Sequence, residues 1–164
     1  MNWYGALRTA LVCAILVILH YTLRPLLAWR ASIDFLLIAL VFGAVRMRPG
    51  LAAVFGLLLG LVSDSLAVSA LGASALGYTV VGFAASWLKA VFFADNLVLN
   101  GFFLFVGKLL YDLIFLIAEH RVQGGGGELA MQIFVWFPLS AAVTALAGVV
   151  ALVLLRPLME VRAA

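Results

Sequence analysis

The chain of 164 residues has few charged side chains, and this scarcity decides its class. Only 10% of the residues are Asp, Glu, Lys or Arg, against about 25% in an ordinary soluble domain. In contrast, 67% are hydrophobic, and the mean hydropathy is +1.25. A soluble protein is excluded, and so is a disordered chain, which would be poor in apolar and aromatic residues. The composition predicts an all-α integral membrane protein that forms a single polytopic transmembrane domain over residues 1–164.

Groups that carry chemistry are also scarce. Cys13 is the single cysteine and lies within an apolar run, so neither a disulfide framework nor a thiolate metal site is available. The sequence has no HExxH or GxSxG motif, no Cys/His spacing for a metal and no Asp-rich transferase motif. The formal charge of +3 comes from dispersed basic residues and not from a basic stripe, which argues against nucleic-acid binding. We therefore expect no enzyme activity and no catalytic, cofactor-binding or metal site.

Six apolar runs are candidate membrane spans, since a spanning helix needs about 20 mainly apolar residues. They cover residues 6–23, 32–45, 50–69, 72–88, 97–118 and 129–155. The second run is short for a full crossing, so it is less tilted, locally thins the bilayer, or forms half of a tight hairpin with the third. Pro138 in the last run predicts a kink or an interfacial segment before it. The runs together predict a compact bundle of about six transmembrane helices.

The Lys and Arg residues near the ends of these runs indicate the orientation in the membrane. With both termini on one side, six basic residues fall on that side: Arg8, Arg46, Arg48, Lys89, Arg156 and Arg162. Three fall on the other side: Arg24, Arg30 and Arg121. Because cytoplasmic loops carry the excess of Lys and Arg, this count predicts that the N- and C-termini both lie in the cytoplasm.

Three charged residues lie deep within apolar runs. Asp64 is about 14 residues into the third run, and Lys108 and Asp112 are about 11 and 15 residues into the fifth, so all three reach a comparable depth. An isolated charge at the bilayer centre costs at least about 2.5 to 3.5 kcal/mol, so we predict a buried cluster of these three side chains. The alternative is that Lys108 and Asp112, four residues apart on one helical face, neutralise each other while Asp64 reaches the outer surface. Arg30 and Asp34 are interpreted as a solvated or interfacial pair.

Small residues recur at a spacing of four in two of the predicted helices. This spacing lets helix backbones approach closely within a bilayer. With the glycine that begins the fourth run, the candidate contact residues are Ala6, Ala10, Ala14, Gly56, Gly60 and Gly72. They form either internal helix-packing contacts or a partner-binding face, and we favour internal packing.

Two stretches of the chain resemble a known family. Residues 56–66 read Gly-Leu-Leu-Leu-Gly-Leu-Val-Ser-Asp-Ser-Leu, and residues 71–78 read Leu-Gly-Ala-Ser-Ala-Leu-Gly-Tyr. They are similar to the MreD family of bacterial rod shape-determining proteins, in which a glycine-spaced helix ends in Gly-Leu-x-x-Asp before a Leu-Gly turn. Residues 33–38 resemble that family's Pro-Asp-Leu-Leu-Leu stretch, with Ile33 at the position of the proline.

The resemblance implies a non-enzymatic scaffold of the cell-elongation (Rod) complex in the bacterial inner membrane. Such a protein helps to control cell shape and peptidoglycan synthesis. It binds MreC directly, with RodA, a penicillin-binding transpeptidase and MreB in the same complex.

The alternative is a substrate-binding S component of an energy-coupling-factor vitamin transporter. That family has a similar number of short-looped spans. Its first helix carries an Ala-x-x-x-Ala motif, which Ala6, Ala10 and Ala14 would satisfy. The predicted bundle resembles that of the S components, so the fold alone does not separate the two families.

Overall fold

The computed structural model describes residues 3–23, 33–66, 72–88, 97–123 and 131–159, and the elements in these ranges are all helices. The α-helices are α1 (Trp3–Leu23), α2 (Phe35–Ala44), α3 (Pro49–Leu66), α4 (Ala73–Trp87), α6 (Leu97–Gln123) and α8 (Phe137–Met159). A π-helical segment, η1 (Gln132–Trp136), precedes α8. Each predicted apolar run coincides with one of these α-helices.

The lengths of the helices fit a membrane protein. Within the described residues, three segments are long and apolar enough to cross a membrane: Pro49–Leu66, Leu97–Ala118 and Gln132–Leu154. Thr9–Thr22 and Phe35–Ala44 are shorter apolar helices. The predicted all-α membrane fold is therefore confirmed.

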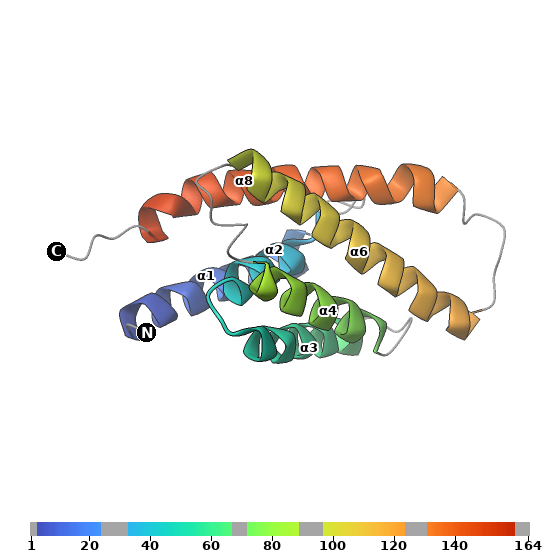
Figure 1. The fold of residues 1–164 in the computed structure, drawn as a ribbon, viewed down its shortest axis with the longest axis horizontal. Helices are drawn as coiled ribbons and strands as arrows, with labels where there is room; N and C mark the ends of the chain where they lie inside the picture. Colours follow the sequence, from blue (N-terminus) through green and yellow to red (C-terminus); the bar gives the residue numbers. More distant parts are fainter. Residues whose placement is uncertain (1–2, 24–32, 67–71, 89–96, 124–130, 160–164) are drawn as a thin grey trace.

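Helix α2 lies in the middle of the bundle (Figure 1) and packs against α1, α3, α4, α6 and α8. It has no polar side chain, and six of its residues are fully buried: Leu36, Leu37, Ile38, Ala39, Leu40 and Ala44. A helix that is apolar on all sides is stable where every side is covered. With 10 residues, α2 is about 15 Å long, half of the hydrocarbon thickness of a bilayer. The short second run is therefore the buried centre of the bundle.

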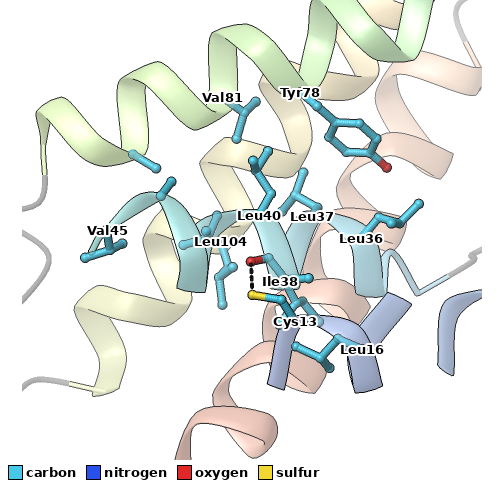
Figure 2. Close-up of a cluster of buried hydrophobic side chains, with 14 of the residues drawn as sticks. Cys13, Leu16, Leu36, Leu37, Ile38, Leu40, Val45, Tyr78, Val81 and Leu104 are labelled. Carbon is cyan, nitrogen blue, oxygen red and sulfur yellow. Dashed lines mark hydrogen bonds between the residues drawn. The ribbon is translucent and has the colours of Figure 1, made fainter. Parts of the chain in front are cut away.

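Figure 2 shows the apolar layer around α2. Side chains from three other helices reach it: Cys13 and Leu16 from α1, Tyr78 from α4 and Leu104 from α6. The Cys13 thiol donates a hydrogen bond to the carbonyl oxygen of Ala39, with an Sγ–O distance of 3.5 Å. Because a thiol is a weak donor, close packing contributes most of the stability of α1 on α2.

Glycines allow α3 and α4 to form the most extensive helix pair. Gly56 faces the backbone at Tyr78, and Gly60 faces the backbone at Ala75. A methyl group on either glycine would overlap those backbone atoms, and both glycines are buried. This four-residue glycine spacing therefore serves the internal packing of α3 on α4.

The alanine repeat of α1 has a different position. Ala10 and Ala14 are exposed, whereas the contact with α2 is made by residues such as Cys13 and Leu16. The preference for internal packing is therefore wrong for Ala10 and Ala14. The side chain of Ala6 lies outside the described residues.

Before Pro138, where the sequence predicts a kink or an interfacial segment, the chain forms η1. The N–H group of Phe137 donates to the carbonyl oxygen of Gln132, which is the i to i−5 bond of a π-helix. Pro138 has no N–H group to donate, and its ring disfavours a regular helical turn before it. The wider π turn accommodates the proline without ending the helix, since η1 continues directly into α8.

Gly60→Ala should destabilise the protein, because the added methyl group would overlap the backbone of Ala75. We expect the free energy of unfolding to fall by about 1–3 kcal/mol, the usual result of overpacking. Circular dichroism during an SDS titration of the detergent-solubilised protein measures the change.

Gly50→Ala is the matched control, since a methyl group at Gly50 would meet nothing within 4 Å. Ala is the better helix former, so this variant should keep its stability or gain up to about 1 kcal/mol. Equal stability of the two variants would show that the close approach at Gly60 is unimportant.

Candidate functional site

Asp34 begins helix α2 as its N-cap residue. Its Oδ1 atom accepts a hydrogen bond from the N–H group of Leu37 at 3.1 Å. The carboxylate also lies at the positive end of the helix dipole, where a negative charge is stabilised. Asp34 is only 5% exposed, so its charge depends on partners within the protein.

Four neighbouring helices supply polar partners to Asp34. The Tyr78 hydroxyl of α4 lies 3.0 Å from both carboxylate oxygens and donates to them. The Lys108 Nζ atom of α6 is 3.5 Å from Oδ2, and the His20 Nδ1 atom of α1 is 3.9 Å from Oδ1. The N–H group of Asp34 donates to Thr144 Oγ1 of α8 at 3.2 Å. The N-cap residue of α2 thus links α1, α4, α6 and α8.

Lys108 lies between two carboxylates. Its Nζ atom is 2.5 Å from Asp112 Oδ1, in an ion pair between positions i and i+4 of α6. The same ammonium group lies 4.7 Å from the centre of the Tyr111 ring. Lys108 and Asp112 are both buried, and Asp112 Oδ2 has no hydrogen-bond partner among the described residues. We call Asp34, Lys108 and Asp112 the buried charge cluster.

Asp64 is bound elsewhere, at the start of α4. Its Oδ2 atom accepts hydrogen bonds from the N–H groups of Gly72 and Ala75 at 2.9 and 3.1 Å. Its Oδ1 atom accepts from the N–H group of Ser74 at 3.2 Å. Asp64 therefore caps a neighbouring helix, where its negative charge meets the positive end of the α4 dipole.

Gly72 has a conformational role and not the packing role expected from its small size. Its φ of +97° lies in the left-handed region, which residues with a side chain rarely adopt. A Cβ atom there would meet nothing within 4 Å, so Gly72 is not a close-packing contact. Its backbone N–H group is instead one of the donors to Asp64.

The predicted cluster is corrected in one member. Lys108 and Asp112 are paired, but the second carboxylate beside Lys108 belongs to Asp34 and not to Asp64. Asp64 is 3% exposed, so its alternative position at the outer surface is also wrong. Backbone N–H groups satisfy this buried carboxylate without a cation. The predicted solvated pair with Arg30 is wrong for Asp34, which is buried, and Arg30 itself lies outside the described residues.

A series of contacts nevertheless connects Asp64 with Asp34. Ser74, which donates its N–H group to Asp64, accepts a hydrogen bond on its hydroxyl from Tyr111 at 3.1 Å. The Tyr111 ring stacks on the Tyr78 ring with a centroid distance of 4.5 Å and an interplanar angle of 17°. The Tyr78 hydroxyl then reaches Asp34. The two carboxylates therefore belong to one polar layer of the bundle.

Five residues of this layer were not predicted to belong to it from the sequence: His20, Asp34, Tyr78, Tyr111 and Thr144. For His20 and Asp34, one available signal was their position along the chain. His20 lies near the end of the first predicted helix and Asp34 near the start of the second. In a bundle whose helices alternate in direction, those two ends meet on the same side.

The polar contacts of this site hold neighbouring helices in fixed positions relative to one another. Charge-assisted hydrogen bonds in a low-dielectric interior are strong and directional, so they fix the relative heights of the helices that share them. Within the described ranges, no group of His, Cys, Asp and Glu could hold a metal ion.

The comparison with protein families adds the biological context. The family described as rod shape-determining protein MreD matches residues 5–161, nearly the whole chain. The chain belongs to the MreD family. The resemblance in residues 33–78 is therefore confirmed, and this MreD family member has a role in rod shape determination. Searches of curated proteins and of solved structures gave no match.

Lys108→Met should strongly destabilise this MreD family member, because it leaves the carboxylates of Asp34 and Asp112 without their shared cation. We expect a loss of about 3 kcal/mol or more in the free energy of unfolding. The double variant Lys108→Met/Asp112→Asn should be more stable than the single one, since Asp34 keeps its contacts with Leu37, Tyr78 and His20.

The same SDS titration measures the free energy of unfolding of these variants. Arg48→Met is the control for loss of a positive charge, because Arg48 is exposed, and it should change stability by less than about 0.5 kcal/mol. Losses that simply add in the double variant would argue against a shared charge cluster.

Proposed function

We propose that this protein is a non-enzymatic scaffold of the bacterial cell-elongation complex and that it binds MreC directly. The family match over residues 5–161 carries this proposal. RodA, a penicillin-binding transpeptidase and MreB belong to the same complex. Because the described chain consists of closely packed apolar helices, the protein acts by holding the membrane helices of its partners in place.

We further propose that the chain passes six times through the bacterial inner membrane, with both termini in the cytoplasm. Six α-helices are described, and the start of α1 and the end of α8 lie at the same end of the molecule (Figure 1). The excess of Lys and Arg on that side supports the orientation. Helix α2 is short for a crossing, but eight of its ten residues are buried among the neighbouring helices.

Reporter fusions test this orientation. Alkaline phosphatase, which is active only outside the cytoplasm, should be inactive when fused after Ala164 and active when fused after Gly125. A green fluorescent protein fused after Ala164 should be fluorescent. An active phosphatase at the C-terminus would reverse the proposed orientation.

The exposed side of α1 is the proposed MreC-binding face. Ala10 and Ala14 lie there, beside the exposed side chains of Leu11 and Ile15. The contacts of α1 are with α2 and, less extensively, with α8, so this face is uncovered in the described structure. Small residues on a membrane helix allow a second helix to approach closely, and the transmembrane helix of MreC is the proposed occupant.

Ala14→Leu should weaken binding of MreC by about tenfold or more, because the larger side chain would separate the two helices. Quantitative co-purification with tagged MreC in mild detergent measures the loss. The folding of the variant should be unchanged, because Ala14 is exposed. Val54→Phe enlarges an exposed residue of α3 and is the matched control, which should bind MreC normally.

Two outcomes would overturn these proposals. Normal MreC binding by Ala14→Leu would remove the proposed face and leave the scaffold function intact. Co-purification of paired ATPases and a large membrane coupling subunit instead of MreC would contradict the scaffold function and favour a vitamin-transport component.

A further inference from the structure

With both carboxylates ionised, the buried charge cluster carries a net negative charge. Asp34 and Asp112 supply two negative charges, and Lys108 supplies one positive charge. These residues are 5%, 9% and 5% exposed respectively, so water screens their charges little. A net charge in such surroundings is costly, which favours a second cation in contact with the cluster.

His20 is placed to supply that cation. It is 4% exposed, and its Nδ1 atom lies 3.9 Å from Asp34 Oδ1, whereas Lys108 approaches the other oxygen of the same carboxylate. His20 also lies in the last turn of α1, where the helix dipole stabilises a positive charge. We propose that His20 binds a proton in the folded protein and that this proton fastens α1 to the rest of the bundle.

The groups around His20 support this assignment. Tyr21 of α1 makes an edge-on ring contact with His20, with the ring centroids 5.2 Å apart. The carboxylate of Asp34, the N-cap residue of α2, lies beside the imidazole. Tyr78 of α4 and Lys108, Tyr111 and Asp112 of α6 are the other titratable groups at this end of the polar layer. Asp64, at the other end of the series of contacts, has its carboxylate held by the backbone N–H groups of Gly72, Ser74 and Ala75. Helix α8 contributes Thr144, which is not titratable, and has no ionisable residue between 131 and 154. Protonated His20 therefore makes two cations for two carboxylates.

Release of the proton should loosen α1. This helix contacts α2 and, less extensively, α8, so fewer helices hold it than hold α2. The His20–Asp34 contact is its ionic link to the cluster. If opening of α1 releases one proton, the opening equilibrium constant rises about tenfold per pH unit over the range in which the proton is bound only in the closed state.

Cys13 provides a native probe of this opening. It is the single cysteine of the chain and faces α2 from α1, with 8% exposure. We would measure its rate of reaction with a maleimide in the purified full-length protein over a pH series. Dividing each rate by that of the SDS-unfolded protein at the same pH removes the titration of the thiol itself. The normalised rate should rise by about tenfold per pH unit through the release range.

His20→Gln removes the proton and should abolish this pH dependence, leaving the normalised rate constantly high. His120→Gln removes the only other histidine and is the matched control, which should keep the wild-type dependence. A flat wild-type profile, or an unchanged slope in His20→Gln, would overturn the proposal.

A second measurement applies if His20→Gln does not fold. In the His120→Gln protein labelled with ¹⁵N-histidine, His20 is the single source of imidazole NMR signals. These signals should report an imidazolium ion at neutral pH, and a neutral ring would overturn the proposal. Neither measurement requires a partner protein, so the result is independent of MreC binding.

Discussion

The carboxylate of Asp34 must keep its polar partners, and the arrangement of the helices depends on this requirement. Apolar side chains can slide past one another at little cost, because one apolar neighbour replaces another. A buried carboxylate has no such freedom, since losing a partner leaves an uncompensated charge. The contacts of Asp34 with His20, Tyr78, Lys108 and Thr144 therefore fix the heights of α1, α4, α6 and α8 relative to α2.

Helix α3 is fixed by a different combination of forces. Gly56 and Gly60 bring its backbone close to α4, and the carboxylate of Asp64 holds the first N–H groups of α4. Ser86 of α4 donates its hydroxyl to the carbonyl oxygen of Met47 at 2.8 Å, in the turn that joins α2 to α3. Close packing thus sets the distance between α3 and α4, and hydrogen bonds at both ends set their register.

The sequence predicts the helices well, because lipid allows few alternatives to long apolar helices bounded by charges and turns. It also identifies Lys108 and Asp112 as neighbours, since residues four apart share a helical face. The prediction that Asp64 is the second partner of Lys108 was wrong for a physical reason. The depth of a residue along its helix follows from counting residues. The packing of the whole bundle, however, decides which helices are adjacent and which of their faces are in contact. Asp34 lies at the edge of an apolar run, and at such a position the sequence does not distinguish a buried carboxylate from a solvated one.

The central position of α2 has a consequence for biogenesis. Among the described helices, α2 is synthesised before α6 and α8, yet these later helices cover it in part. Until Thr144 arrives, the backbone N–H group of Asp34 lacks its acceptor, and until Lys108 arrives the carboxylate lacks its ammonium partner. The native environment of α2 is therefore completed only when the C-terminal helices have been inserted, so a chain truncated before α8 would expose an unfinished polar layer inside the membrane.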